Sequence, residues 1–381
     1  MSEYLFIQPV DVLYVRGNRL FGEAGHAQAL MPPWPSLAAG AIRSRMLADS
    51  GVDLAAFAAG KDSPEGSLGQ CLGTPASPGT FRINRFLLGK KVDDGTVEPF
   101  LPLPADVTTY RTKTEYLQPR MLHPDLTVSC KLPLVPVLRQ DKPEKPLGGC
   151  WLNRKGISAY LAGDPLLDDY IIGQQELWEN DPRLGIAMDP VTRTAAEGRI
   201  YTTETVALKQ KVGFLVNVEG AAGCLPHDGL LRFGGDGRSA TVSTCRVNFP
   251  QTPWGRIAAE ERFRLVLATP GIFDEGWLLP RLDEKNGNLI LRFGDCKARL
   301  AAAAFNRAEV VSGWDLAKQS PKHARRAAAT GSVYWLDRLE GNVDGLRSLI
   351  EAGLCTLMDD LDPARRAEGF NNVFIAAWPR D

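Results

Sequence analysis

Residues 32–49 read Pro-Pro-Trp-Pro-Ser-Leu-Ala-Ala-Gly-Ala-Ile-Arg-Ser-Arg-Met-Leu-Ala-Asp, and this stretch decides the fold class. The prolines end an extended segment, and Ser36 after them is the expected N-cap of a helix that runs to about Asp49. The small residues at 38–41 keep this helix slim, which suits close packing on a sheet. The stretch therefore predicts a helix that covers a sheet.

The rest of the chain predicts strands and helices mixed in both halves. Strand and helix do not alternate steadily, so an α+β architecture is favoured over a doubly wound parallel sheet. The length of 381 residues suggests two or three domains, and a weak two-fold organisation divides the chain into domains 1–208 and 209–381. Expected strands include 4–8, 81–88, 211–218, 240–247, 262–268 and 332–336; the Ala-rich 297–305 and 343–352 are expected helices, and 60–79 is an expected loop.

The charge balance limits how this protein could bind nucleic acid. It has 44 Lys plus Arg against 45 Asp plus Glu, a formal net charge of −1. This excludes binding through uniform basicity, as in histone-like proteins, but not binding through local basic patches. Residues 318–326 hold four bases and no acid, whereas 337–381 hold nine acids and five bases. RNA binding would therefore depend on a few specific places.

Cysteines, histidines and the N-terminus indicate a cytoplasmic protein without metal or cofactor. The seven cysteines are scattered outside metal-ligand spacing and are expected to be reduced thiols. The dipeptide His227-Asp228 lacks the further ligands of a metal phosphohydrolase and is interpreted as a turn. The first residues lack the basic region of a signal peptide, and the weakly charged 27–42 is too short and proline-rich to span a membrane.

The first candidate binding element is the run Gly-Gly-Asp-Gly-Arg at 234–238. Its glycines permit positive φ and can expose successive N–H groups, and Arg238 offers a planar fork for phosphate. A hairpin turn explains the same run equally well. The match to the GGD of nucleotidyl cyclases fails, because Gly237 stands where a second metal-binding carboxylate is needed.

The second candidate is the glycine-rich loop 16–26, with Arg16, Arg19 and His26, followed by Arg43 and Arg45 on the helix. Cations around an open loop suit a phosphodiester backbone. An ordinary loop with solvated arginines is the alternative. His26 has the side chain of a general base near neutral pH, but no partner for it is visible in the sequence.

The third candidate is the basic cluster of Lys318, Lys322, Arg325 and Arg326, with His323 among them. Basic residues beside exposed aromatic residues are typical of single-strand binding, and Trp314 precedes this cluster. Tyr334 and Trp335 follow it on a predicted strand, where alternation places only one of the two in the core.

Together these stretches resemble one family. The segments PVDVLYVRG (9–17), PPWPSLAAGAIRSRML (32–47), PRLGIAMDPVTRTAAEGRIYTTE (182–204), FGGDGR (233–238) and the late VSGWD and ARRAAATGSVYW look like the RAMP-superfamily CRISPR-associated protein that is the third subunit of the type III-B Cmr effector complex. The resemblance runs in order from about residue 4 to 337.

This resemblance implies two ferredoxin-like (RRM-like) domains with loop insertions. It also implies a non-catalytic role: the subunit grips the 5′ tag of the crRNA, meets target RNA through the complex, and joins the large polymerase-like subunit to the backbone RAMP subunits. The implied RNA-facing residues are Arg16, Arg19, Arg43, Arg45, Gly234, Gly235, Gly237, Arg238, Lys322, Arg325 and Arg326, to which the charge pattern adds His26 and Lys318.

Two other hypotheses stay open. RAMP relatives that process repeat RNA use a histidine near the first helix, so His26 could be the acid/base of a metal-independent endoribonuclease. The chain could also be an RRM-like scaffold outside CRISPR biology.

Overall fold

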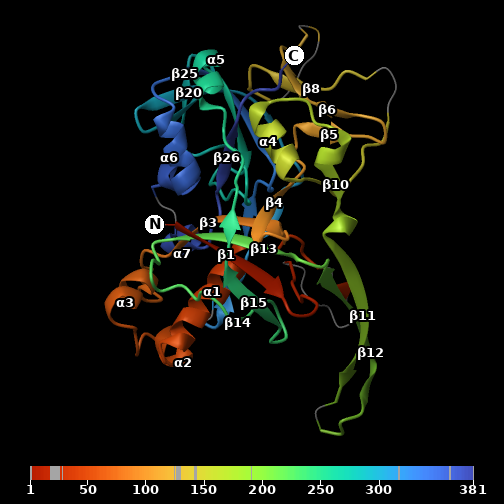
Figure 1. Ribbon diagram of the computed structural model, residues 1–381, viewed down its shortest axis with the longest axis vertical. Coiled ribbons are helices and arrows are strands. Elements are labelled where there is room, and N and C mark those ends of the chain that lie inside the picture. Colours follow the sequence, from red (N-terminus) through yellow and green to blue (C-terminus); the bar gives the residue numbers. More distant parts are fainter. Residues whose placement is uncertain are drawn as a thin grey trace.

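Two large sheets, one above the other along the long axis, organise the computed structural model (Figure 1). The structure describes residues 2–17, 26–27, 29–123, 125, 130–140, 144–189, 191–315, 318–359 and 362–380. Within these ranges no helix is both long enough and apolar enough to cross a bilayer.

The first sheet is nine-stranded, in the order β10-β9-β4-β3-β13-β1-β15-β14, with β16 paired to β4. Its core side is apolar because alternate residues of the central strands, such as Leu5, Ile7 and Phe214, point to one face. Its strands are β1 (Ser2–Pro9), β3 (Arg82–Lys91), β4 (Thr96–Pro102), β9 (Cys150–Leu152), β10 (Ile171–Gly173), β13 (Val212–Glu219), β14 (Leu230–Arg232), β15 (Ser239–Thr244) and β16 (Arg246–Val247).

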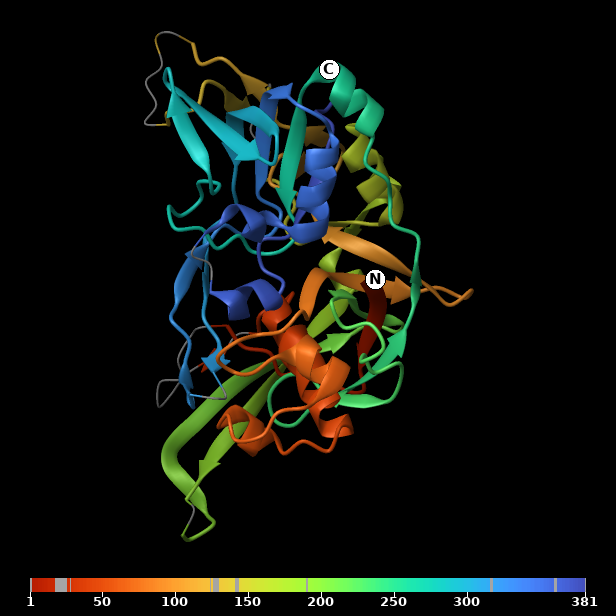
Figure 2. The ribbon, with the colours of Figure 1, turned by 90° about the vertical axis from the view of Figure 1, so that its left-hand side faces the viewer.

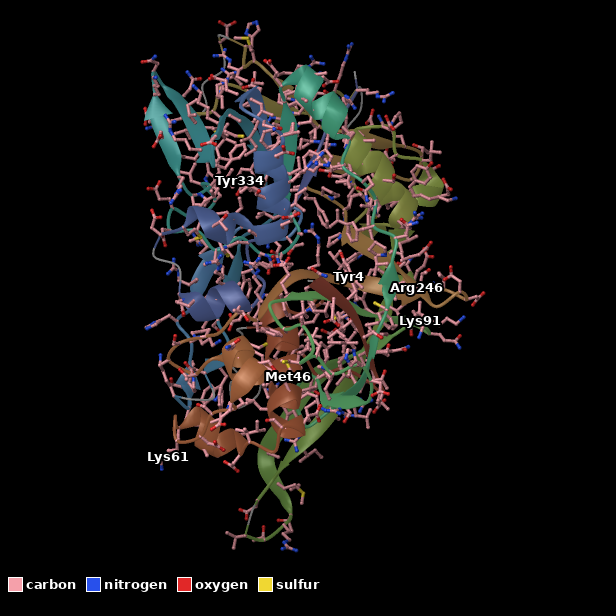
Figure 3. All side chains as sticks on the ribbon, turned by 60° about the vertical axis from the view of Figure 1, so that its left-hand side comes forward. Tyr4, Met46, Lys61, Lys91, Arg246 and Tyr334 are labelled. Atoms are coloured by element: carbon pink, nitrogen blue, oxygen red, sulfur yellow. The ribbon has the colours of Figure 1, made fainter. Side chains whose placement is uncertain are left out.

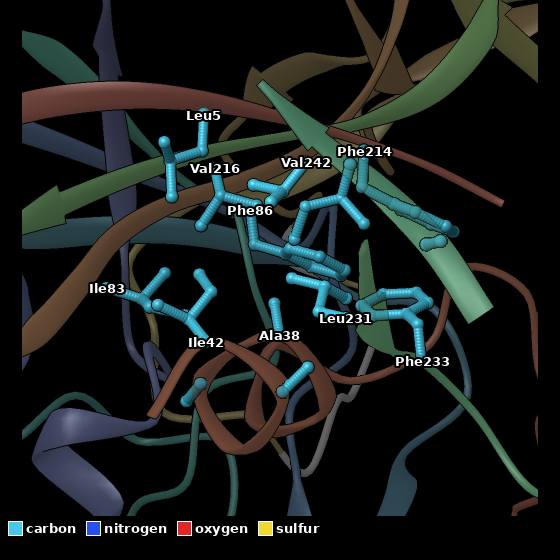
Figure 4. Packing of buried hydrophobic residues seen from close by; sticks show 14 of the residues in the cluster. Leu5, Ala38, Ile42, Ile83, Phe86, Phe214, Val216, Leu231, Phe233 and Val242 are labelled. Atoms are coloured by element: carbon cyan, nitrogen blue, oxygen red, sulfur yellow. The ribbon is translucent and has the colours of Figure 1, made fainter. Parts of the chain in front are cut away.

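Helix α1 (Pro35–Asp49) covers this face, as the sequence predicted. Figure 4 shows Ala38 and Ile42 directed at side chains of the sheet, among them Phe86. The prediction of Ser36 as N-cap is wrong: Trp34 is the N-cap and the helix starts at Pro35. Proline has a φ suited to the first helical turn and no N–H to satisfy, so it fixes the start there.

The second sheet is six-stranded, in the order β18-β19-β20-β25-β17-β26, with helix α6 (Asp344–Ala352) packed on it. The predicted helix at 297–305 is wrong, because this segment forms β20 between β19 and β25. Alanine has the highest helix propensity, but its advantage is less than about 1 kcal/mol per residue, and pairing on both sides outweighs it. The small side chains fit a strand covered on both faces. The strands are β17 (Phe263–Leu267), β18 (Leu282–Lys285), β19 (Asn288–Phe293), β20 (Cys296–Ala304), β25 (Val333–Glu340) and β26 (Val373–Ala376).

Tyr334 and Trp335 are both fully buried, so the prediction that only one belongs to the core is wrong. They lie on β25, whose two faces are covered by two different apolar clusters. Burial raises the pKa of Tyr334, whose hydroxyl donates to the Trp277 carbonyl at 2.6 Å. Figure 3 shows Tyr334 inside the second half and Met46 inside the first.

The central strands of the two sheets follow the same order. We number the four central strands of each sheet by their order in the chain. Read across the sheet, both sheets then have the order second, third, first, fourth: β3-β13-β1-β15 and β20-β25-β17-β26. The α+β prediction is confirmed. The predicted division at 208/209 does not coincide with the division between the sheets, because β13 and β15 pair with β1. The sheets separate between β16 and β17.

A long hairpin projects beyond the body (Figure 1). It consists of β11 (Trp178–Met188) and β12 (Ala195–Leu208), and β2 (His26–Ala27) pairs with β12. Leu184, Ile186 and Ile200 are exposed along it.

Short helices and hairpins complete the fold. One of them, α3, lies within the predicted loop 60–79 and corrects that prediction. They are α2 (Leu54–Ala58), α3 (Gly66–Leu72), α4 (Arg154–Ala162), α5 (Trp254–Glu260), α7 (Pro363–Ala367), three 3₁₀ turns η1 (Asp168–Tyr170), η2 (Gln174–Glu176) and η3 (Leu354–Leu357), and the strand pairs β5 (Val107–Thr109) with β6 (Thr114–Tyr116), β7 (Gln118–Arg120) with β8 (Val135–Val137), β21 (Glu309–Val311) with β24 (Arg325–Ala327), and β22 (Trp314–Asp315) with β23 (Ser320–Pro321).

A buried ion pair joins the two halves. Arg264 of β17 contacts Asp106 at 2.5 Å, and both side chains are fully buried. The same guanidinium donates to the carbonyls of Tyr160 and Ala377 at 2.8 Å each, and the Tyr160 hydroxyl donates to Asp106 at 2.8 Å. Burial alone would lower the pKa of Arg264, but the adjoining tyrosines and Asp106 outweigh it and raise the pKa.

We expect Asp106→Asn to lower the free energy of unfolding by about 3–5 kcal/mol, because Arg264 would stay buried without its counter-charge. Urea unfolding followed by circular dichroism measures the change. Asp283→Asn is the control, since its pair with Arg292 is more than half exposed and should contribute less than about 1 kcal/mol. Equal effects of the two substitutions would contradict the interlocking role of Asp106.

Candidate nucleic-acid interface

A pocket of about 530 Å³ brings together parts of all three elements singled out in the sequence. Residues 14–16 come from the N-terminal segment, 234–236 from the glycine run, and 313–314 from a long excursion of the second half; the start of α1 completes the wall. We call this the aromatic pocket, because Tyr14, Trp34 and Trp314 line it.

The glycine run folds tightly against the N-terminal segment. The Gly235 N–H donates to the Tyr14 carbonyl at 2.7 Å. Gly234 has φ +93°, and a Cβ there would lie 3.0 Å from the Tyr14 carbonyl oxygen, so a side chain would be strained and crowded. The Arg238 N–H donates back to the Gly235 carbonyl at 3.2 Å. The run is thus a closed turn that forms one wall of the pocket.

Arg238 already has a carboxylate partner. Its Nη1 lies 2.7 Å from Oδ2 of Asp11, and 29% of the Arg238 side chain is exposed. The phosphate fork expected from the sequence is therefore occupied by an internal acid. Gly237, at φ +64°, turns the chain before Arg238 and does not line the pocket.

Arg16 lies at the pocket and Arg19 lies outside the described residues. The Arg16 guanidinium stacks 4.4 Å above the Tyr14 ring and donates to the Tyr14 hydroxyl. For His26 the structure describes the backbone, which pairs with Thr202, but not the side chain.

Arg43 and Arg45 hold α1 in place and do not line the pocket. Arg43 donates to the Leu72 carbonyl at 3.2 Å, and burial lowers its pKa. Arg45 bonds Asp49 at 2.6 Å and also donates to the Leu230 carbonyl. The Asp49 partner is local, but the Leu72 and Leu230 carbonyls lie 29 and 185 residues away in the chain, so the sequence could not indicate these two contacts.

The excursion of the second half, residues 309–315 and 318–327, is called the arm. Figure 2 shows it, in blue, passing from the second half along the side of the first. Its tip carries Trp314, which is 54% exposed. The Lys322 N–H donates to the Gly313 carbonyl at 2.8 Å, so Lys322 lies directly behind the tip.

A buried carboxylate anchors the arm. Glu368, only 6% exposed and next to α7, pairs with Lys322 and with Arg365, the latter at 3.2 Å. Arg365 in turn donates to the Ser312 carbonyl at 3.1 Å. Lys322 is therefore a positioning residue for the arm in this structure.

The other bases of the cluster differ in their environment. Lys318 lies 3.7 Å from Asp315, and Arg325 lies 2.7 Å from Asp274. Arg326 is exposed and has no ion pair among the described residues. Most of the predicted cations thus have a carboxylate partner within the protein. The described lining of the aromatic pocket therefore offers three aromatic rings and only one arginine, Arg16.

Tyr14 and Trp34 are pocket residues that the sequence reasoning missed. Tyr14 stands two residues before Arg16, and Trp34 stands among three prolines just before the helix begins. An aromatic residue beside each cationic or proline-rich loop is a signal that could have indicated them.

Comparison with known proteins identifies relatives. The model of the family "CRISPR-associated protein (Cas_Cmr3)" matches residues 5–378. The chain is similar in fold to one in a type III-B Cmr-beta structure bound to cognate target RNA and AMPPnP (16% identity) and to one in a structure bound to cognate target RNA (15%). Both comparisons have a TM-score of 0.50 and cover 98% of this chain and 96% of the other. No curated protein matches.

We expect Glu368→Ala to loosen the arm, because Lys322 and Arg365 would lose a buried counter-charge. Amide hydrogen exchange at 309–327 should accelerate by at least tenfold, with the protected Lys322 amide as the marker. Glu340→Ala removes an exposed partner of Lys297 and should leave the arm unchanged. Unchanged protection in Glu368→Ala would contradict the anchoring role.

Proposed function

Because this chain belongs to the Cas_Cmr3 family of CRISPR-associated proteins, we propose that it is a crRNA-binding subunit of a type III-B Cmr effector complex. In this role it grips the 5′ tag of the crRNA and joins the large polymerase-like subunit to the backbone subunits. Target RNA reaches it through the assembled complex.

The aromatic pocket carries this proposal. Residues 14–16, 234–236 and 313–314 are far apart in the chain, yet all three segments line it. Single-stranded RNA is bound largely by stacking of splayed bases on aromatic rings, at roughly 1–3 kcal/mol per base. Tyr14, Trp34 and Trp314 supply such rings, and Arg16 supplies a cation beside them.

The local charge pattern indicates binding by shape and stacking. Arg238, Lys322 and Arg325 each face a carboxylate, so a phosphate must compete with an internal acid. For single strands the slope of log K against log salt is about −0.7 per neutralised phosphate. Because few cations lack a carboxylate partner, we expect the affinity for RNA to depend only weakly on salt. We also expect the isolated subunit to bind RNA weakly outside the complex.

We further propose that the two halves are ferredoxin-like modules. Their shared strand order supports this. In the first half α1 connects the first and second strands, and in the second half α6 connects the third and fourth. A ferredoxin-like module has a helix in both of these connections. Here the other connection of each half, residues 220–238 in the first and 268–295 in the second, contains strands and no such helix among the described residues. On this proposal the modules divide between β16 and β17.

Loss of the exposed ring in Trp314→Ala should weaken binding of tag-bearing crRNA to the assembled complex by about 5–150-fold, as expected for one lost stacking contact. Fluorescence anisotropy measures the affinity. Leu167→Ala is the matched control, because Leu167 is also 54% exposed but does not line the pocket. Unchanged affinity in Trp314→Ala would argue against the pocket as the RNA site.

We propose a non-catalytic role, and the described lining of the pocket includes no histidine. The purified protein should cleave neither repeat RNA nor target RNA in gel assays without metal. Cleavage of repeat RNA that His26→Ala abolishes would replace this proposal with a metal-independent endoribonuclease.

A further inference from the structure

A second pocket of about 270 Å³ lies behind the aromatic pocket, between the two halves. The two pockets share Leu30, Pro33 and Trp34, so the Trp34 ring stands between them. We call the second one the inner pocket. Its volume falls just below the range of about 300–1,000 Å³ typical of sites for drug-sized ligands, so it suits one planar ring system.

The walls of the inner pocket are apolar and aromatic. Phe86, Phe100 and Trp151 of the first sheet form one side, and Ala268 and Pro270 of the second half form the other. All five are buried, at one-tenth exposure or less. An apolar and aromatic lining suits the faces of a planar heterocycle.

Four polar residues interrupt this apolar lining: Thr269, Asn306, Glu309 and Thr330. Glu309, the first residue of the arm, is half-buried, and its Oε2 accepts a hydrogen bond from the Trp34 indole at 3.3 Å. Burial raises the pKa of Glu309, while the Trp34 indole and the Thr330 N–H act against that rise. Asn306 is exposed at the rim.

Glu309 keeps unused acceptor capacity. A carboxyl group offers about four acceptor positions, and two donors are accounted for. The ionised carboxylate accepts from an N–H donor and has no proton to donate. It therefore disfavours ligands that bring a carbonyl oxygen against it, because neither group would be paired.

We propose that the inner pocket takes one unstacked purine base whose exocyclic amino group donates to Glu309. The assignment rests on the proposed RNA-binding function and deepens it: a strand held at the aromatic pocket passes one base behind Trp34. Uracil has a single N–H donor on this edge, between two carbonyl oxygens that meet the carboxylate unfavourably, so it binds most weakly. Cytosine has the amino group but a smaller ring, so it binds less well.

The test compares the hexaribonucleotides rA6, rC6 and rU6 on the full-length chain by fluorescence anisotropy. We expect rA6 to bind roughly tenfold more tightly than rU6, with rC6 between them, as for one discriminating hydrogen-bond pair. Glu309→Gln adds an amide N–H2 that can pair with a uracil carbonyl, so the preference for rA6 should shrink. Glu309→Met removes the acceptor at similar size, so rA6 and rU6 should bind with equal affinity.

Glu340→Met is the control, because Glu340 is an exposed partner of Lys297 outside this pocket, and it should retain the preference. Equal binding of rA6 and rU6 to the native chain, or a preference that survives in Glu309→Met, would overturn the base assignment. The base assignment would also fail if none of the hexamers binds but tag-bearing crRNA does bind. In that case the proposed function would stand. If the assembled complex fails to hold tag-bearing crRNA through this subunit, both proposals fail.

Discussion

The buried pairing of Arg264 with Asp106 is the constraint on which the rest of the structure depends. It couples a strand of the second sheet to residues of the first half, in a place where water cannot substitute for either partner. Tyr160 bonds the carboxylate and stacks its ring 4.2 Å from the guanidinium, so the charge is fully enclosed. A buried pair of this kind contributes little net stability over an apolar contact, but it penalises every arrangement that separates its members.

The pockets depend on this fixed arrangement. Neither half alone forms the walls: the aromatic pocket takes Trp34 from the first half and Trp314 from the arm of the second. Glu309 holds the Trp34 indole across the same boundary, and Glu368 anchors the arm directly behind its tip. The aromatic rings therefore meet in a defined geometry only when the halves are locked together.

The sequence was informative about elements determined by local chemistry. Helix α1 and strands β1, β3, β13 and β17 lie close to the segments that the sequence predicted. Failures occur where distant contacts decide the outcome: the alanines of β20 form a strand because both neighbours are strands, and Tyr334 and Trp335 are both buried because clusters cover both faces.

The same limit applies to the site. The glycine run, the N-terminal segment and the arm were each recognisable, and the fold brings parts of all three to one pocket. What the sequence could not show is the partner of each cation. Asp11 lies 227 residues from Arg238, Glu368 lies 46 residues from Lys322, and Asp274 lies 51 residues from Arg325. Counting bases alone thus overstated how much free positive charge the surface offers.

We propose that this subunit holds crRNA where its two halves and the arm meet. Ultraviolet crosslinking of the assembled complex, followed by mass spectrometry of RNA-linked peptides, tests it most directly. The account predicts crosslinks on peptides that contain Tyr14, Trp34 or Trp314. Crosslinks confined to other surfaces of the subunit, with these three peptides unmodified, would contradict it.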